Sequence, residues 1–167
     1  GYASLTANTT GTVNVAVGTS ALTANTTASY NTALGYAALS TNITGAQNTA
    51  VGYSALTLAT GADNTAVGSQ ALASVAAGTF NTALGRSAGQ GVTTGNDNVA
   101  LGYLALNLNT ASNRNVAVGS EALKTLNVTS DTHVYNTAVG YATGTAVTTG
   151  VQNTFIGGLA GAAITTG

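Results

Sequence analysis

Few side chains of this sequence have the chemistry of an enzyme or a metal site, and they lie in two short segments. The first, Gly85-Arg-Ser-Ala-Gly89, has the Gly-x-Ser-x-Gly spacing in which serine hydrolases present their nucleophile. That chemistry requires a strand–turn–helix bend, with a histidine and an acid beside the serine. The second, residues 127–135, contains Asp131 and the lone histidine, His133. Because zinc sites need clustered cysteine and histidine, and the chain has no cysteine, we expect no metal here.

The composition excludes several further classes of function. Charged residues make up 4% of the 167 residues, against about 25% in an average protein. Three cations cannot form the basic face that nucleic acid requires, and four acids are too few for a calcium-binding repeat. The sequence has no apolar run of about 20 residues that would span a membrane as a helix. The hydrophobic content of 44% nevertheless favours a packed structure over a disordered one. We expect a non-catalytic protein without a cofactor.

An internal repeat determines which elements carry these residues. The motif Asn-(Thr/Val)-(Ala/Phe)-(Val/Leu/Ile)-Gly recurs every 17 residues, with one interval of 16 and one of 21. Its first residues, the anchor asparagines, are Asn14, Asn31, Asn48, Asn64, Asn81, Asn98, Asn115, Asn136 and Asn153. Its last residues, the bend glycines, are Gly18, Gly35, Gly52, Gly68, Gly85, Gly102, Gly119, Gly140 and Gly157. The Gly-x-Ser-x-Gly match has the repeat positions of Gly52-Tyr-Ser-Ala-Leu56, so we interpret it as repeat sequence rather than as a nucleophile.

The repeat predicts an all-β fold, a parallel β-solenoid of about ten rungs. Thr, Val and frequent Gly disfavour helix, and no apolar stripe of period 3.6 persists. We expect two strands in each rung, one at Asn-Thr-Ala-Val and one at Ala-Leu, with the bend glycine between them. The Asn-Thr-Thr-Gly segment would be the turn that starts the next rung. Both chain ends lie inside a repeat, so residues 1–167 are expected to be a single segment of a longer fibre, with a loop insertion at 127–135.

Stacked rungs place like residues above one another, about 4.8 Å apart. We expect one apolar ladder at the Val/Leu position of the motif, a second at the Leu after each bend, and a third ladder of anchor asparagines whose amides hydrogen-bond along the stack. The Ala that precedes each Val/Leu, as at Ala33, faces the opposite way. Such an Ala column allows close approach of another copy, which favours self-association along that face, with three-fold closure a common solution for fibres. A slim monomeric solenoid with Ala in its interior is the alternative.

The segment Asn48-Thr-Ala-Val-Gly-Tyr-Ser-Ala-Leu56 resembles the head repeats of YadA-like trimeric autotransporter adhesins. It is similar also to repeats of phage-type tail fibres that end in an endosialidase-type intramolecular chaperone. The resemblance extends over the whole chain, although the adhesin repeat is usually shorter, with Ser-Val-Ala-Ile-Gly in place of the motif. It implies a left-handed parallel β-roll, wound as a homotrimer and displayed outside the cell or on a virion.

Three sets of side chains are candidates for binding. The tyrosines that follow bend glycines, Tyr36, Tyr53, Tyr103 and Tyr141, tolerate polar replacement in other rungs and are expected to be exposed, where they would contact sugars or a neighbouring chain. Asp131 and His133 lie in the insertion, and loops on a regular scaffold often carry binding residues. A column of threonines resembles that of ice-binding solenoids, but Ala77 and Ala111 interrupt it; it comprises Thr10, Thr27, Thr44, Thr60, Thr94, Thr129, Thr149 and Thr166.

These features predict a structural or adhesive segment of an extracellular fibre, either an adhesin head or stalk or a viral tail fibre. The expected partners are further copies of the chain and a host-surface glycan or protein, without nucleic acid and without membrane insertion in this segment. Two alternatives stay open from the sequence. The first is a self-assembling structural filament without a receptor, and the second is an ice-binding solenoid.

Overall fold

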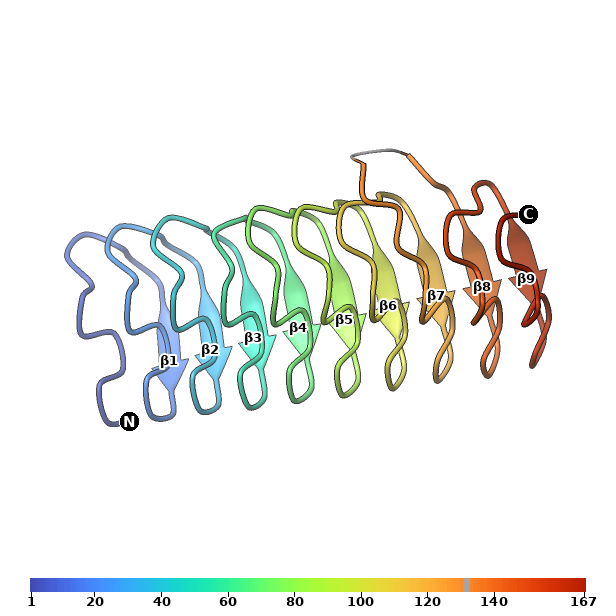
Figure 1. Cartoon of the computed structure of the whole chain (residues 1–167). Coiled ribbons are helices and arrows are strands. Elements are labelled where there is room, and N and C mark those ends of the chain that lie inside the picture. Colours follow the sequence, from blue (N-terminus) through green and yellow to red (C-terminus); the bar gives the residue numbers. More distant parts are fainter. Residues whose placement is uncertain (131–132) are drawn as a thin grey trace.

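Each period of the sequence forms one rung of a continuous coil, and each of nine rungs contributes one short strand to a single sheet. The computed structural model describes residues 1–130 and 133–167. The strands are β1 (Val15–Val17), β2 (Thr32–Leu34), β3 (Thr49–Val51), β4 (Thr65–Val67), β5 (Thr82–Leu84), β6 (Val99–Leu101), β7 (Val116–Val118), β8 (Thr137–Val139) and β9 (Thr154–Ile156). All are parallel and pair in chain order, so the rungs form one row from the N-terminal to the C-terminal end (Figure 1). The prediction of an all-β parallel solenoid is confirmed.

The register between rungs follows the repeat position by position. In β2 and β3, Ala33 pairs with Ala50 and Leu34 with Val51. The register survives both irregular intervals of the repeat, because Thr49 pairs with Thr65 across the short one. Val116 pairs with Thr137 across the long one. The missing and extra residues are therefore absorbed outside the strands, and the described residues between β7 and β8 project beyond the other coils (Figure 1).

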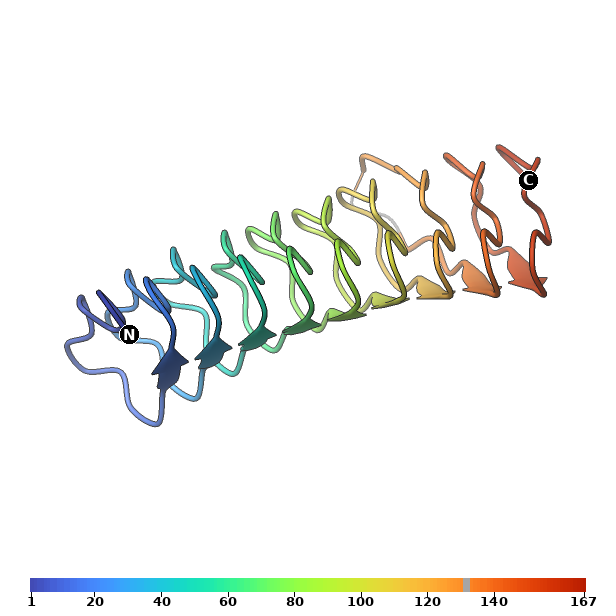
Figure 2. The same ribbon diagram turned by 90° about the horizontal axis from the view of Figure 1, so that it is seen from below.

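The prediction of a second strand in each rung is wrong. The Ala-Leu segment after each bend glycine forms turns, because its backbone alternates into the left-handed region. In the second rung, φ is 54° at Ala37 and 52° at Leu39, which is incompatible with an extended strand. Hydrogen bonds between rungs continue here all the same, since the Leu39 N–H donates to the Ala55 carbonyl at 3.1 Å. The strands therefore line one edge of the coil, and the turns rise away from them (Figure 2).

The interior is lined by the Ala column of the strands and by the Leu column after the bends. Ala33 and Leu39 are fully buried, whereas Leu34 is 46% exposed. The expectation that copies of the chain associate along the Ala face is therefore wrong, because these alanines are enclosed within their own coil. Leu and Asn side chains from the rest of the rung, such as Leu39 and Asn48, are buried with them. The alternative of a slim solenoid with Ala inside is the one observed.

The bend glycines are required for two separate reasons. Their φ angles lie between +111° and +139°, a region that residues with a Cβ atom rarely adopt. Neighbouring bends also touch. A Cβ atom on Gly102 would lie 2.5 Å from the carbonyl oxygen of Gly119 on the next rung. Gly157, in the last bend, has the positive φ but no atom within 4 Å of such a Cβ.

Gly102→Ala and Gly157→Ala separate these two reasons. Both substitutions strain φ, but only Gly102→Ala forces two rungs apart. We expect its free energy of unfolding to fall by about 1–3 kcal/mol more than that of Gly157→Ala, the usual cost of overpacking. Urea denaturation followed by circular dichroism measures the difference. Equal losses would mean that φ alone explains the glycine column.

A local exchange of volume occurs in the last two rungs. β9 has Phe155 where the other strands have Ala, and the Leu position after the bend is Gly144 in one rung and Gly161 in the next. A Cβ atom on Gly161 would lie 2.4 Å from the Phe155 ring, and one on Gly144 would lie 3.1 Å from it. The ring thus occupies space that leucine fills in most other rungs; the rung of β5, with Ala83 and Gly89, has neither the ring nor the leucine.

We expect Phe155→Ala to destabilise the C-terminal rungs by about 2 kcal/mol, part of the usual cost for a buried Phe because the ring is half-buried. Adding Gly144→Leu recreates the Ala and Leu combination of the other rungs. Gly144 has φ +60°, close to the values of the other leucines in that column, so the leucine fits the backbone. The double variant should recover most of the loss in thermal denaturation, and a further decrease would contradict the exchange.

Candidate functional site

The anchor asparagines lie one above another and join each rung to the next. The Asn31 Oδ1 accepts a hydrogen bond from the Asn48 backbone N–H at 2.9 Å, and the Asn31 Nδ2 donates to the Gly45 carbonyl at 2.9 Å. Both partners belong to the following rung. In the middle of the stack the amides also bond to one another, as where Asn98 Nδ2 donates to Asn81 Oδ1 at 3.1 Å. Each anchor side chain thus replaces two backbone contacts that the coil cannot make at this corner.

A second interior column, not recognised as such in the sequence, lies at the first residue of the Asn-Thr-Thr-Gly turn. Asn25, Asn42 and Asn109 are fully buried there, and other rungs have Val75 or Val92 at this place. The Asn42 Nδ2 donates to the Gly45 carbonyl at 2.8 Å, while its Oδ1 accepts from the Gly45 N–H at 3.0 Å. The anchor amide of the previous rung also reaches that carbonyl, so valine is tolerated without leaving it unpaired. The alternation of Asn with Val at one repeat position was the sequence signal that could have indicated a buried column, because valine is rarely chosen for a fully exposed turn.

Replacing an anchor asparagine should cost far more in the middle of the stack than at its end. Asn98→Ala would leave the buried Asn115 N–H without its acceptor, whereas the Ser112 carbonyl would keep the Asn109 amide as a donor. We expect a loss of about 1–3 kcal/mol for the N–H left unpaired. The control is Asn153→Ala, since Asn153 is only half-buried and bonds to the exposed Gly167. A similar small loss for both variants in urea denaturation would contradict a structural role for the ladder.

The outward side of the sheet carries most of the large apolar side chains that are exposed. Its centre is the Val/Leu position of the motif, here called the outer ladder: Val17, Leu34, Val51, Val67, Leu84, Leu101, Val118, Val139 and Ile156. Every member is exposed or half-exposed, with Leu84 at 56% and Ile156 at 72%. The ladder runs from β1 to β9 without a charged residue. The apolar ladder expected in the sequence is therefore present, and it points to solvent.

Two further columns flank the outer ladder at opposite ends of the strands. The strand-start column precedes the anchor asparagines: Val13, Tyr30, Gln47, Asp63, Phe80, Asp97, Arg114, Tyr135 and Gln152. The strand-end column follows the bend glycines: Tyr2, Thr19, Tyr36, Tyr53, Ser69, Arg86, Tyr103, Ser120, Tyr141 and Gly158. Most members are exposed, including Tyr36, Tyr53, Tyr103 and Tyr141, the four candidate binding tyrosines. Together with the outer ladder and the Thr/Val position that begins each strand, where Val15, Thr65 and Thr82 are exposed, they make up the outer face of the sheet.

The tyrosines of the strand-end column contact their neighbours in the stack. Tyr36 and Tyr53 stack with ring centroids 5.4 Å apart and planes 9° from parallel. The Arg86 guanidinium lies over the Tyr103 ring at 5.7 Å. Tyr36 and Tyr53 thus cover one face of each other's rings, and both side chains remain more than half exposed and available for contact with another surface.

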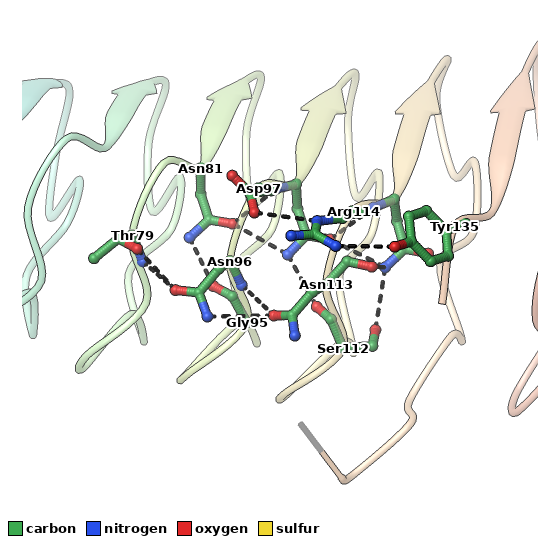
Figure 3. Close-up of polar contacts among 11 residues, drawn as sticks. Thr79, Asn81, Gly95, Asn96, Asp97, Ser112, Asn113, Arg114 and Tyr135 are labelled. Atoms are coloured by element: carbon green, nitrogen blue, oxygen red, sulfur yellow. Dashed lines mark hydrogen bonds and ion pairs between the residues drawn. The ribbon is translucent and has the colours of Figure 1, made fainter. Parts of the chain in front are cut away.

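The strand-start column contains a charged group that spans three rungs. Arg114 Nε lies 3.5 Å from Asp97 Oδ2, and Arg114 Nη1 donates a hydrogen bond to the Tyr135 hydroxyl at 2.9 Å (Figure 3). The hydrogen bond to Tyr135, followed by the ring's electrostatic contribution, raises the pKa of Arg114 above its ordinary value. The guanidinium is fully charged at physiological pH in any case.

The insertion brings His133 next to this group. The His133 ring meets the Tyr135 ring edge-on, with centroids 5.8 Å apart, and His133 forms an isolated parallel bridge with Asn113. His133 is exposed, and the following Val134 is fully buried, which returns the chain to the coil. Asp131, the other candidate of this segment, lies outside the described residues.

Neither the serine motif nor the threonine column forms a reactive site. Ser87 is 5% exposed, and its N–H bonds to the Ser69 carbonyl at 2.9 Å, in an ordinary bend without a following helix. The threonines of the column lie outside the strands, and Ala111, which interrupts it, is 8% exposed. Within residues 1–130 and 133–167 no pocket is present, and no three metal-ligating side chains gather.

No protein-family model, curated protein or solved structure matches this chain. The part of the chain that the structure describes also contains no helix with the length and hydropathy to cross a membrane.

Proposed function

We propose that this chain is a non-catalytic structural and adhesive segment of an extracellular fibre, on a cell or virion surface, and that three copies associate through the outer face of the sheet. The observation that supports this most is the outer ladder, an unbroken apolar strip along all nine strands. At about 4.8 Å per strand the strip is roughly 40 Å long. Exposed apolar surfaces of this kind mark sites of association in proteins.

The rung-to-rung bonding supports a mechanical role. The same amide and backbone hydrogen bonds recur in rung after rung. A longer rod therefore needs only further rungs with the same contacts. Such a rod holds a binding element at a distance from the surface that anchors it. We assign contact with a host-surface glycan or protein to the insertion at 127–135, because its described residues, 127–130 and 133–135, lie outside the regular strands and the chain projects there beyond the other coils (Figure 1).

The two alternatives from the sequence receive less support. An ice-binding face needs a flat, regular array, whereas the threonine column lies outside the strands of the sheet and is interrupted at Ala77 and Ala111. A filament without a receptor shares the outer face, but it grows by open-ended association. A closed trimer has a mass that stops increasing with concentration, which separates the two.

The trimer is tested by analytical ultracentrifugation of the whole chain. We expect three times the chain mass, independent of concentration above the dissociation constant. Leu84→Glu, which puts a carboxylate in the outer ladder, should shift the chain to monomer while the circular dichroism spectrum is unchanged. Leu108→Glu is the matched control, since Leu108 is 49% exposed but lies away from the outer face. A monomeric wild-type chain, or equal effects of both substitutions, would overturn the proposal.

A further inference from the structure

The charges of the outer face are few and are divided between its two flanks. Arg86 is the charged member of the strand-end column, whereas Asp63, Asp97 and Arg114 belong to the strand-start column. Among the described residues the ion pairs join Arg114 to Asp97 and Lys124 to Glu121. Arg86 and Asp63 are therefore not paired within the described part of the chain. One charge of each sign is left available, on opposite flanks.

These charges also occupy consecutive levels of the stack. Asp63 precedes β4, Arg86 follows β5 and Asp97 precedes β6. The three residues thus lie on neighbouring rungs, with Arg86 on the middle level. In the strand-start column, the residue on the same rung as Arg86 is Phe80. Rungs are about 4.8 Å apart, so the two carboxylates lie roughly 10 Å apart along the stack, one rung above and one rung below Phe80.

Rotation of one copy about an axis parallel to the stack places the strand-start column of one chain beside the strand-end column of the next. In that arrangement Arg86 faces Phe80 of its neighbour. Its guanidinium is then one rung from the carboxylates of both Asp63 and Asp97, within reach of a long side chain. Arg86 already lies over an aromatic ring in its own chain, so a second ring is a compatible surface.

We infer that copies of this chain pack parallel and in register through their outer faces, and that Arg86 of one chain, set between Asp63 and Asp97 of the next, fixes this register. The inference rests on the proposed association through the outer face. The occupant of the face is a second copy, because the lone cation of one flank lies level with the midpoint between two acids of the other flank, one rung from each. The uncharged ladder sets no register by itself, since Val and Leu repeat on every rung.

An antiparallel pair does not satisfy these charges. A twofold axis along the strands puts the strand-start column of one chain against the strand-start column of its partner. Arg86 then lies on the flank away from all the acids of that column. The parallel arrangement is the one in which the unpaired cation and the unpaired acid meet.

Charge reversal tests the contact. Arg86→Glu should raise the dissociation constant of the assembly about tenfold or more in low salt, because like charges then face each other. Lys124→Glu makes the same change of charge at a residue paired with Glu121 away from the outer face, and should leave the constant unchanged. Adding Asp63→Arg to Arg86→Glu restores a pair of opposite sign and should recover most of the affinity. Circular dichroism confirms that each variant is folded.

Cross-linking tests the register independently, since the chain has no cysteine of its own. Gln47→Cys and Tyr53→Cys lie on one rung, in opposite flanking columns. When the two variants are refolded together, oxidation should join them as a dimer. Gln47→Cys refolded with Tyr103→Cys should not cross-link, because these positions lie three rungs apart, about 14 Å, which is beyond the reach of a disulfide.

The outcomes distinguish the two proposals. A monomeric wild-type chain overturns both the association and its register. An associating wild type in which Arg86→Glu behaves like Lys124→Glu overturns only the inference about Arg86. Failure of Asp63→Arg to rescue, or a cross-link from Tyr103→Cys in place of Tyr53→Cys, does the same. Selective loss, rescue and the same-rung cross-link together support parallel, in-register packing.

Discussion

Hydrogen bonding between each rung and the next is the interaction on which this molecule depends. The backbone of one rung bonds almost continuously to the rung after it, in strands and in turns alike. Where the backbone cannot do so, the amide of an anchor asparagine takes its place. This contact holds neighbouring backbones at a fixed small separation, so any residue whose side chain would lie between two rungs must be glycine. The bend glycines, with the next glycine's carbonyl oxygen 2.3–2.7 Å from an added Cβ in all but the last, are the clearest consequence.

The same stacking holds backbone conformations that the residues themselves do not favour. Leu39, Tyr30 and Phe80 have φ angles of 52°, 62° and 57°, and each has counterparts in the same column on other rungs. The left-handed region costs about 1–2 kcal/mol for such residues, and in the Leu39 column glycine avoids that cost at Gly89, Gly144 and Gly161, while the other rungs keep a larger residue. These conformations persist because hydrogen bonds from the rungs above and below determine them together. The stack therefore carries its strain evenly, several residues in each rung.

Stacking explains the scarcity of charge as well. A charged residue repeated at one position would place like charges about 4.8 Å apart along the entire molecule. In the strand-start column, Phe80 separates Asp63 from Asp97, and Asp97 is followed by Arg114, so adjacent charges have opposite sign. Uncharged amides, hydroxyls and small apolar groups can repeat without this penalty. The composition thus reflects the architecture, and the few charges are free to mark particular levels of an otherwise uniform surface.

Much of the fold follows from the sequence, because a 17-residue period can satisfy its hydrogen bonds only by repeating them. The period, the parallel strands at the motif, the vertical alignment of anchor asparagines and the bends at glycine are all readable from spacing and residue type. Spacing and residue type do not show whether the side chains of a given column point into the coil or out to solvent. Ala33 and Leu34 are both apolar, and their alternation is the same whichever one points inward. The outcome depends on the width of the coil, which is set by Leu39 and Asn48 across the interior and by turns whose left-handed residues no propensity indicates. The tertiary structure alone therefore decided that alanine fills the core and that Val and Leu form an exposed face, because interior volume is a property of the closed rung and of no single segment.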